Sequence, residues 1–257
     1  MADRTRLVEV ARRSGRRRPQ PVAICHHRRV SRGLEVPDGL VEGLGSSRER
    51  RIHDHWIRID PAWWTDSISR HGLPAVPLRV TLDDRGRAGI TRGAIFGIAA
   101  EGTVGSIMSL LVHSLAWGGG VKYRLMRKRL DTVAVSIEDA RDLLAEAAAA
   151  SRTDPMSAYD LLYPGGRTRL KFLGPAFFTK FLYFAGGGLP AHPCLIIDER
   201  TASALEGLGW DGLGTTGWSA STYAEYCEQL RDWADQAAVS LGRSVAADEV
   251  ERWLFER

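Results

Sequence analysis

The sequence predicts a mainly α-helical protein with one core and little or no β structure. Helical spacing of apolar residues dominates from residue 52 onward, whereas strand-like alternation is best in "AVPLRVTL", residues 75–82. The chain has 257 residues, of which 44% are hydrophobic. A chain of this size and composition buries enough apolar surface to form one sizeable helical core.

The first fifty residues differ from the rest in composition. Arginines crowd "RTRLVEVARRSGRRRPQ" and "HHRRVSR", and no helical or strand period is sustained there. We therefore expect a basic, poorly ordered N-terminal extension over residues 1–50 and an α-helical domain over residues 51–257. The formal net charge of +4 and a pI of about 9.1 favour a polyanionic partner, nucleic acid first, because binding releases condensed counterions. A solvated tail is the alternative interpretation of the extension.

The first half of the domain contains several predicted helices. A proline follows Asp60, which predicts a helix start at that aspartate. Segment 90–117 predicts two or more buried helices, and the glycines at 118–120 predict a turn after them. Ser136 stands before an acidic first turn and a run of leucine and alanine, which predicts an N-cap followed by a long helix.

The second half continues the helical pattern. Asp198 follows an apolar run and precedes "ERTASALE", so it is a predicted N-cap of a short helix. Residues 219–242 and 246–257 predict two closing helices, because their aromatic and aliphatic residues recur at intervals of three and four. The whole domain therefore reads as one helical unit.

Several classes of protein are disfavoured. The longest apolar region, residues 94–117, contains Glu101 and His113, which disfavours a membrane-spanning helix. The charged N-terminus lacks the apolar segment of an export signal, so the cytoplasm is the expected location. We also expect the protein to be a monomer. The cysteines, Cys25, Cys194 and Cys227, are too far apart for a zinc ribbon or an iron–sulfur loop.

A single lysine lies in an otherwise apolar segment, "GPAFFTKFLYFAG", residues 174–186. On a helix, the same-face neighbours of Lys180 are Ala176, Phe177, Tyr183 and Phe184. Burial among such groups favours the uncharged form of an amine, which is nucleophilic. The alternative is a structural lysine whose stem lets the ammonium reach solvent.

Asp198 is the predicted partner of this lysine. It follows Lys180 by eighteen residues, and the glycines at 186–188 allow the chain to turn back. A carboxylate beside the amine could accept its proton and then stabilise positive charge on a substrate, as nucleophilic displacement at a sugar carbon requires. The alternative is that Asp198 acts only as a helix cap.

The segment "LKFLGPAFFTKFLYFAGGGLPAHPCLIIDERTASAL", residues 170–205, resembles the helix–hairpin–helix DNA glycosylases, and in particular bacterial proteins of the 8-oxoguanine DNA glycosylase fold. The resemblance implies a helix–hairpin–helix at about residues 157–186. It also implies that Lys180 attacks C1′ of the damaged nucleotide with help from Asp198, and that the resulting Schiff base allows an AP-lyase step. The family's LPGxGxK hairpin is altered here to "LGPAFFTK", which has one glycine, Gly174, and a phenylalanine pair where the second glycine would stand.

Further site residues follow from the resemblance. Double-stranded DNA is the expected partner, and the protein is expected to associate with the nucleoid. The hairpin contacts with DNA phosphates fall on Arg167, Arg169, Lys171 and Gly174. Three aromatic residues are candidates for the pocket of a flipped-out base, with core packing as the alternative for each: Trp117, Trp218 and Tyr223.

Two functions remain open. The first is a DNA glycosylase acting on an oxidised purine or on a modified base of phage DNA, the latter as antiviral defence. The second is a non-catalytic DNA-binding protein that keeps the helix–hairpin–helix scaffold. No cofactor is expected, and His53 and His55 form a poor metal site because no third ligand is evident. The sequence also lacks a GxSxG turn, a Walker motif and a dinucleotide-binding glycine pattern.

Overall fold

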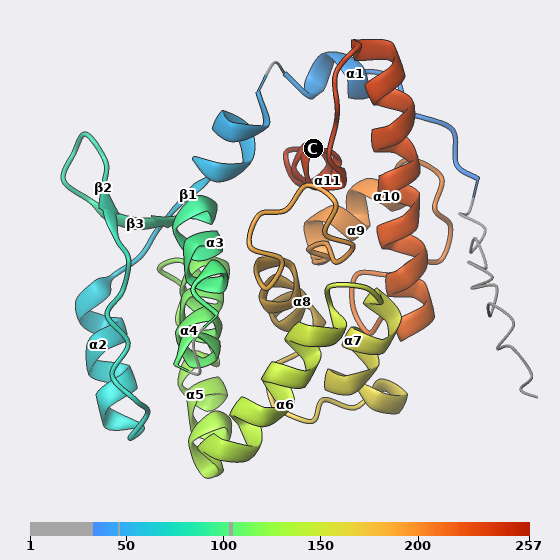
Figure 1. Cartoon of the computed structure of the whole chain (residues 1–257). Coiled ribbons are helices and arrows are strands. Elements are labelled where there is room, and N and C mark those ends of the chain that lie inside the picture. The colour runs from blue at the N-terminus through green and yellow to red at the C-terminus, as the bar shows by residue number, and fades with distance from the viewer. Residues whose placement is uncertain (1–32, 46, 103–104) are drawn as a thin grey trace, which may run out of the picture.

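The computed structural model describes residues 33–45, 47–102 and 105–257. Residues 1–32 of the predicted basic extension (residues 1–50), together with Cys25, lie outside the described residues. The described part is mainly helical, as the sequence predicts (Figure 1). No helix in these ranges is long and apolar enough to cross a lipid bilayer.

Ordered packing begins before the predicted boundary at residue 50. The elements here are α1 (Leu40–Gly43), the π-helical turn η1 (Glu49–His53), β1 (Trp56–Arg58) and α2 (Pro61–Arg70). Leu40 and Leu44 are fully buried, and the carbonyl of Leu34 accepts hydrogen bonds from Gln229 and Trp233. The expectation of a poorly ordered extension is therefore wrong from residue 33 onward, because apolar residues at this spacing cover a distant helix.

The β structure is a small antiparallel sheet. It consists of β1, β2 (Thr81–Leu82) and β3 (Ala88–Thr91) in the order β1-β3-β2. Of the predicted strand at residues 75–82, only the last two residues pair. The sequence did not reveal β1 and β3, because each has only three or four residues and their pairing joins Trp56 to Thr91 across a long loop.

The next four helices are α3 (Arg92–Ala100), α4 (Ser106–Gly119), α5 (Met126–Val135) and α6 (Ile137–Ala150). The predicted turn at residues 118–120 is shorter than expected, because α4 continues through Gly119 and only Gly120 has a positive φ, of 55°. Ser136 is the N-cap residue of α6, and its hydroxyl donates to Asp139.

The remaining elements are α7 (Pro155–Leu162), the 3-10 turn η2 (Pro164–Gly166), α8 (Pro175–Phe184), α9 (Glu199–Glu206), α10 (Ala220–Leu241) and α11 (Ala247–Phe255). Helices α7 and α8 flank the loop of the predicted helix–hairpin–helix. The predicted N-caps Asp60 and Asp198 each accept backbone N–H groups of the following turn, which fixes where α2 and α9 begin.

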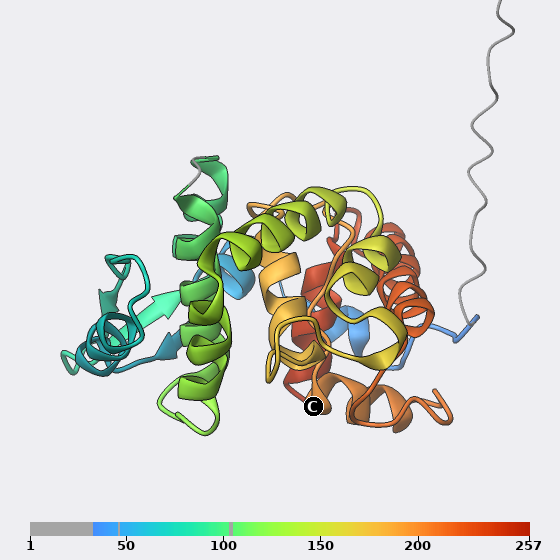
Figure 2. The same ribbon diagram turned by 90° about the horizontal axis from the view of Figure 1, so that it is seen from below.

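The helices form two groups. The sheet, α2, α3, α4 and α5 lie on one side, and α7 to α11 lie on the other, with α6 passing between them (Figures 1 and 2). The groups meet where α4 packs against α8, while α10 packs against α7 and α11. The core at this junction is rich in aromatic side chains, including the fully buried Phe178, Phe181 and Phe184. Lys180, which lies on α8, is therefore at the junction of the two groups.

Candidate active site

Lys180 lies in the middle of α8 and is 6% exposed. Its Nζ atom donates to the carbonyl of Ala176 at 2.8 Å and to Oδ2 of Asp198 at 3.0 Å. An ammonium has three donors, so two of them have protein acceptors. The alternative interpretation, a lysine whose amine extends freely into solvent, does not describe this structure. The lysine side chain does run back along α8 toward the first turn of the helix.

Asp198 has two structural tasks at once. Its Oδ1 atom accepts the N–H groups of Arg200 and Thr201 at 3.2 Å and 3.3 Å, which caps α9. Its Oδ2 atom faces Lys180. The two sequence interpretations of Asp198, a cap and a lysine partner, are therefore compatible, because each uses a different oxygen.

The segment that carries Asp198 is held in place by hydroxyl groups. The N–H of Ile197 donates to Oγ1 of Thr179, which directly precedes the lysine. The hydroxyls of Tyr223 and Tyr226 donate to the carbonyls of Leu195 and Ile196 at 2.8 Å and 2.6 Å. These bonds fix the aspartate relative to the lysine by anchoring the three residues that directly precede Asp198.

The charges of the pair support each other. Burial alone raises the pKa of Asp198, but the adjacent Lys180 charge, its hydrogen bond and the N–H groups of Thr201 and Arg200 outweigh burial, and the pKa lies below its usual value. Opposite charge and donated hydrogen bonds both favour a carboxylate. The carboxylate is therefore ionised at neutral pH and carries the charge that pairs with Lys180.

Gly118, near the end of α4, forms the opposite wall of the site. A Cβ atom at this position would lie 2.8 Å from Cδ of Lys180, so a side chain here would displace the lysine. Trp117 is next to it, is 5% exposed and packs edge-on against His55 and Phe184. Of the three aromatic base-pocket candidates, Trp117 is thus the one that directly precedes the glycine beside Lys180.

The other two aromatic candidates are packed in the core. Tyr223 is fully buried, and its hydroxyl holds the Asp198 segment as described above. Trp218 is 3% exposed, and its Nε1 donates to the carbonyl of Gly214. Tyr223 therefore offers no free face to a base in this arrangement, because its ring is fully buried, and Trp218 is nearly so.

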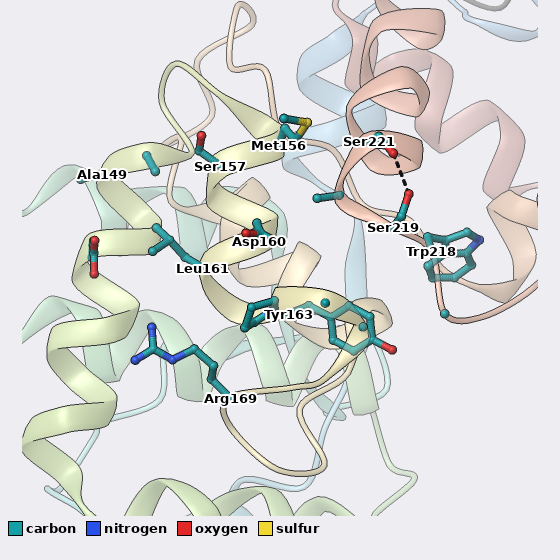
Figure 3. A pocket seen from close by; sticks show the side chains of 17 residues that line it. Ala149, Met156, Ser157, Asp160, Leu161, Tyr163, Arg169, Trp218, Ser219 and Ser221 are labelled. Atoms are coloured by element: carbon teal, nitrogen blue, oxygen red, sulfur yellow. Dashed lines mark hydrogen bonds between the residues drawn. The ribbon is translucent and has the colours of Figure 1, made fainter.

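Trp218 lines a separate cavity of about 1300 Å³ between α6, α7 and the start of α10. Figure 3 shows its lining, with Asp160 and Leu161 on α7, Arg169 in the hairpin loop, and Ser219 hydrogen-bonded to Ser221. Neither Lys180 nor Asp198 belongs to this lining. Size alone therefore does not identify the reactive site, and the paired amine and carboxylate are the better guide.

The predicted phosphate contacts lie on the loop between α7 and α8. Arg167, Arg169 and Lys171 are exposed there, and Gly174 is the residue that precedes α8. Three cations on one short loop next to the lysine site provide positive charge without buried partners. This arrangement suits contacts with a nucleic-acid backbone.

A buried arginine joins this loop to the basic stretch of α5. The Nε of Arg129 donates to the carbonyl of Phe172 at 3.0 Å, and Nη1 donates to that of Arg124 at 3.2 Å. Its guanidinium also lies 3.7 Å from the ring centroid of Phe177, in the first half of α8. Two basic segments far apart in sequence thereby become one surface beside the site.

Two apolar side chains protrude from this surface. Leu125 and Phe172 are 40% and 36% exposed, and among the described residues they are the only non-glycine residues with positive φ, at 60° and 67°. A left-handed backbone is unfavourable for such residues. Arg129 holds the carbonyls at or next to both positions, so the surrounding hydrogen bonds maintain the strain.

Comparison with known families supports the same interpretation. A family model described as "Putative 8-oxoguanine DNA glycosylase OGG-like protein" matches residues 50–255. The chain belongs to this OGG-like family. No curated protein and no solved structure gave a match. The family match covers the sheet, both helix groups and the lysine–aspartate pair, and it supports the resemblance stated from residues 170–205.

Sequence reasoning missed several residues of this OGG-like site. Gly118 was placed in a turn, His55 was considered only as a metal ligand, and Arg129 was not singled out. No sequence signal could have found them, since each is defined by a partner far along the chain. Among the described residues, no cluster of three or more His, Cys, Asp or Glu side chains could hold a metal ion.

Proposed function

We propose that this OGG-like protein is a DNA glycosylase in which Lys180 is the nucleophile and Asp198 its proton acceptor. The observation that carries the proposal is the 3.0 Å contact between Nζ of Lys180 and Oδ2 of Asp198. A buried amine with a carboxylate partner, placed beside a basic surface, is the combination that displacement at a sugar carbon requires.

The proposed reaction starts with a proton transfer from the ammonium of Lys180 to Asp198. The uncharged Nζ atom then attacks C1′, the N-glycosidic bond breaks, and its electron pair leaves with the base. Asp198 returns its proton to the departing base. When the bond from C1′ to the ring oxygen opens, that oxygen takes a proton from nitrogen and leaves a protonated imine between Lys180 and the sugar.

The same imine allows a second step. It acidifies the C2′–H bond, so loss of that proton can expel the 3′ phosphate and cut the strand by β-elimination. The proposal therefore includes AP-lyase activity after base release.

The surface around the site supports a DNA substrate. Because C1′ of a stacked nucleotide is not open to an amine in a cleft, the nucleotide must be turned out of the duplex. Arg167 and Lys171, with the exposed Arg127 and Lys128 of α5, supply phosphate contacts. The protruding Leu125 and Phe172 are suited to fill the space that the nucleotide vacates, since apolar wedges stabilise unstacked DNA.

An oxidised purine is the proposed substrate class, and the family description is what supports it. A modified base of phage DNA is the second candidate. The two are separated by incubating the protein with duplexes that carry 8-oxoguanine and with DNA that carries other modified bases, and then identifying each freed base by mass.

Borohydride trapping tests the nucleophile directly. The native protein and a duplex carrying the substrate base are mixed with borohydride, which reduces the imine to a stable amine and cross-links protein to DNA. We expect Lys180→Gln to lose both the cross-link and base release, while its affinity for the duplex changes by less than about threefold, since it removes the nucleophile and not the phosphate contacts.

Lys171→Gln is the matched control. It removes an exposed cation from the hairpin loop, so it should weaken DNA binding yet form the cross-link at saturating protein. If native protein binds DNA but neither releases a base nor cross-links to any modified duplex, the chain is a non-catalytic DNA-binding protein and the proposal fails.

A further inference from the structure

A second cavity lies between the N-terminal segment and the last helix. It has a volume of about 600 Å³ and is lined on one side by residues from the segments 44–45, 47–51 and 54–56, and on the other by Arg252 of α11 and by Glu256, which directly follows α11. The contacts between η1 and α11 bring these segments together, as their positions in Figure 1 show. The side chains that matter for its chemistry are Arg50, Arg51, His55, Arg252 and Glu256.

The two arginines on facing walls share one carboxylate. Arg51 and Arg252 each donate to Glu256 through Nη2. Their Nε atoms are buried and have no acceptor among the described residues. Arg50 is exposed, and its guanidinium has no acceptor in the same ranges. Since an unsatisfied buried donor costs free energy, this donor excess needs an explanation.

His55 adds a further donor. Nε of Arg92 donates to Nδ1 of His55 at 3.1 Å, so the proton of the neutral ring lies on Nε2. Burial, together with the charges of Arg92 and Arg252, lowers the pKa of His55 to about 2. The imidazole is therefore uncharged under all ordinary conditions, and its Nε2–H has no acceptor in the described part of the chain.

The charges of the cavity lining also favour a bound anion. Three guanidinium groups of the lining face two carboxylates, Glu256 and the exposed Asp54. Burial lowers the pKa of Arg252, and the nearby charges of Arg92 and Arg51 lower it further, against the effect of Glu256 and Glu251. A bound anion would offset this excess of positive charge.

We propose that this cavity binds a phosphate group, held by Arg51, Arg252 and the Nε2–H of His55. A phosphate has acceptor oxygens on all sides, and guanidinium forks match two of them at once. Turning either guanidinium toward such an oxygen gives its unsatisfied N–H an acceptor. The site is separate from the pair Lys180 and Asp198, and the proposal does not depend on the lysine chemistry.

The position of His55 connects the cavity to the lysine site. Its ring lies 5.0 Å, centroid to centroid, from that of Trp117, and Trp117 precedes the glycine that contacts Lys180. One layer of aromatic rings thus separates the cavity from the nucleophile. The phosphate has two candidate sources, a phosphodiester of bound DNA or a free phosphate such as that of a nucleotide.

Calorimetric titration of the full chain tests the free ligand. Inorganic phosphate and a deoxynucleoside 5′-monophosphate are titrated against a sodium chloride control of equal ionic strength. The double variant Arg51→Gln/Arg252→Gln should weaken saturable phosphate binding at least tenfold. Arg141→Gln, which removes an exposed arginine of α6, should bind like the native protein. If the double variant does not fold, Arg51→Lys/Arg252→Lys keeps both charges, removes the forks, and should show the same direction of change.

DNA binding identifies the other source. In a Lys180→Gln background, the affinity for duplex DNA is measured across salt concentrations for the native and altered cavity. If the cavity holds a DNA phosphate, the double variant lowers affinity and reduces the slope of log K against log salt by about 1, the value for one lost phosphate contact. An unchanged slope with lost nucleotide binding assigns a free phosphate. No saturable phosphate binding and no change in the slope would overturn the proposal.

Discussion

Among the ion pairs of the described residues, Arg92–Glu251 and Lys180–Asp198 differ in how completely their charges are enclosed. Arg92 and Glu251 are both 0% exposed and 2.8 Å apart. Lys180 and Asp198 are 3.0 Å apart, with side chains 8% and 16% exposed. The first pair joins α3 to α11, and the second joins α8 to the start of α9.

The arginine pair belongs to a closed network. Arg92 donates to His55, to Tyr183 and to both oxygens of Glu251. Tyr183 in turn donates to Asp248, which also accepts from Arg48. A guanidinium with so many fixed acceptors has little freedom to exchange a proton or meet a ligand. Its role is to hold the helix groups together.

The lysine pair is less enclosed. The amine has two acceptors for three donors, and one of them, Asp198, is also needed to cap α9. The pair lies at the edge of the core beside a basic surface. The arginine pair is thus fixed on every side, whereas the lysine amine has one donor without an acceptor among the described residues and a partner whose side chain is 16% exposed.

The largest expected effect is a difference in the free energy of unfolding between variants of the two ion pairs. Arg92→Met leaves Glu251 buried without its partner, and this should lower the free energy of unfolding by about 3–5 kcal/mol. Lys180→Met should change it by less than about 1 kcal/mol, because Asp198 keeps two backbone N–H groups and reaches solvent. Urea unfolding measures both.

The double variant Arg92→Met/Glu251→Met serves as the control for that prediction. It removes both charges, so it should recover part of the loss seen in Arg92→Met alone. If Lys180→Met and Arg92→Met lost equal stability, the two ion pairs would not differ in their contribution to the fold, and this prediction would be wrong.

The second expected effect is a loss of activity with little change in stability. Asp198→Asn should lower the rate of base release at least about hundredfold, because an amide accepts no proton. It should alter the free energy of unfolding by less than about 1 kcal/mol, since asparagine is also a good N-cap. Asp154 caps α7 through Met156 and Ser157, so Asp154→Asn is the matched control. Equal rate losses in the two variants would argue against a role of Asp198 in the reaction.

A third, smaller effect tests the wall of the lysine site. Gly118→Ala places a Cβ where only 2.8 Å separates it from Lys180, so the lysine side chain must move. We expect base release to slow about tenfold, a loss of about 1.4 kcal/mol of transition-state stabilisation. Gly105→Ala is the control, since a Cβ there meets nothing within 4 Å among the described residues. Single-turnover rates of base release measure this effect in both variants. Equal rates would show that the close approach of Gly118 to Lys180 has no part in the reaction.

The smallest effect is a difference in pH dependence. The pKa of Asp198 lies below its ordinary value of 3.8, so its interactions stabilise the fold above that pH and are lost as pH falls through the lowered pKa. Asparagine does not titrate. The difference in unfolding free energy between the native protein and Asp198→Asn should therefore shrink below pH 3.8, as acid titration of stability would show. A constant difference down to pH 2 would contradict this.

Local signals were enough for some of the site. Asp60 and Asp198 were identified as helix starts because capping depends on the next three residues. The proximity of Asp198 to Lys180 could be predicted because a glycine turn and a short return segment connect them. The aromatic candidates could not be sorted in this way, since Trp117, Trp218 and Tyr223 look alike in sequence and differ only in what packs on them.

The helical class, the family resemblance and the proximity of Lys180 to Asp198 could be predicted from sequence, because periodicity, caps and a conspicuous lysine are encoded within short stretches. The tertiary structure alone decided that Gly118 forms a wall of the lysine site, that Arg129 joins two basic segments, and that arginines from both ends of the domain line one cavity. These features arise where distant segments meet. Burial and hydrogen-bond partners at such places depend on packing, and packing is a property of the whole chain.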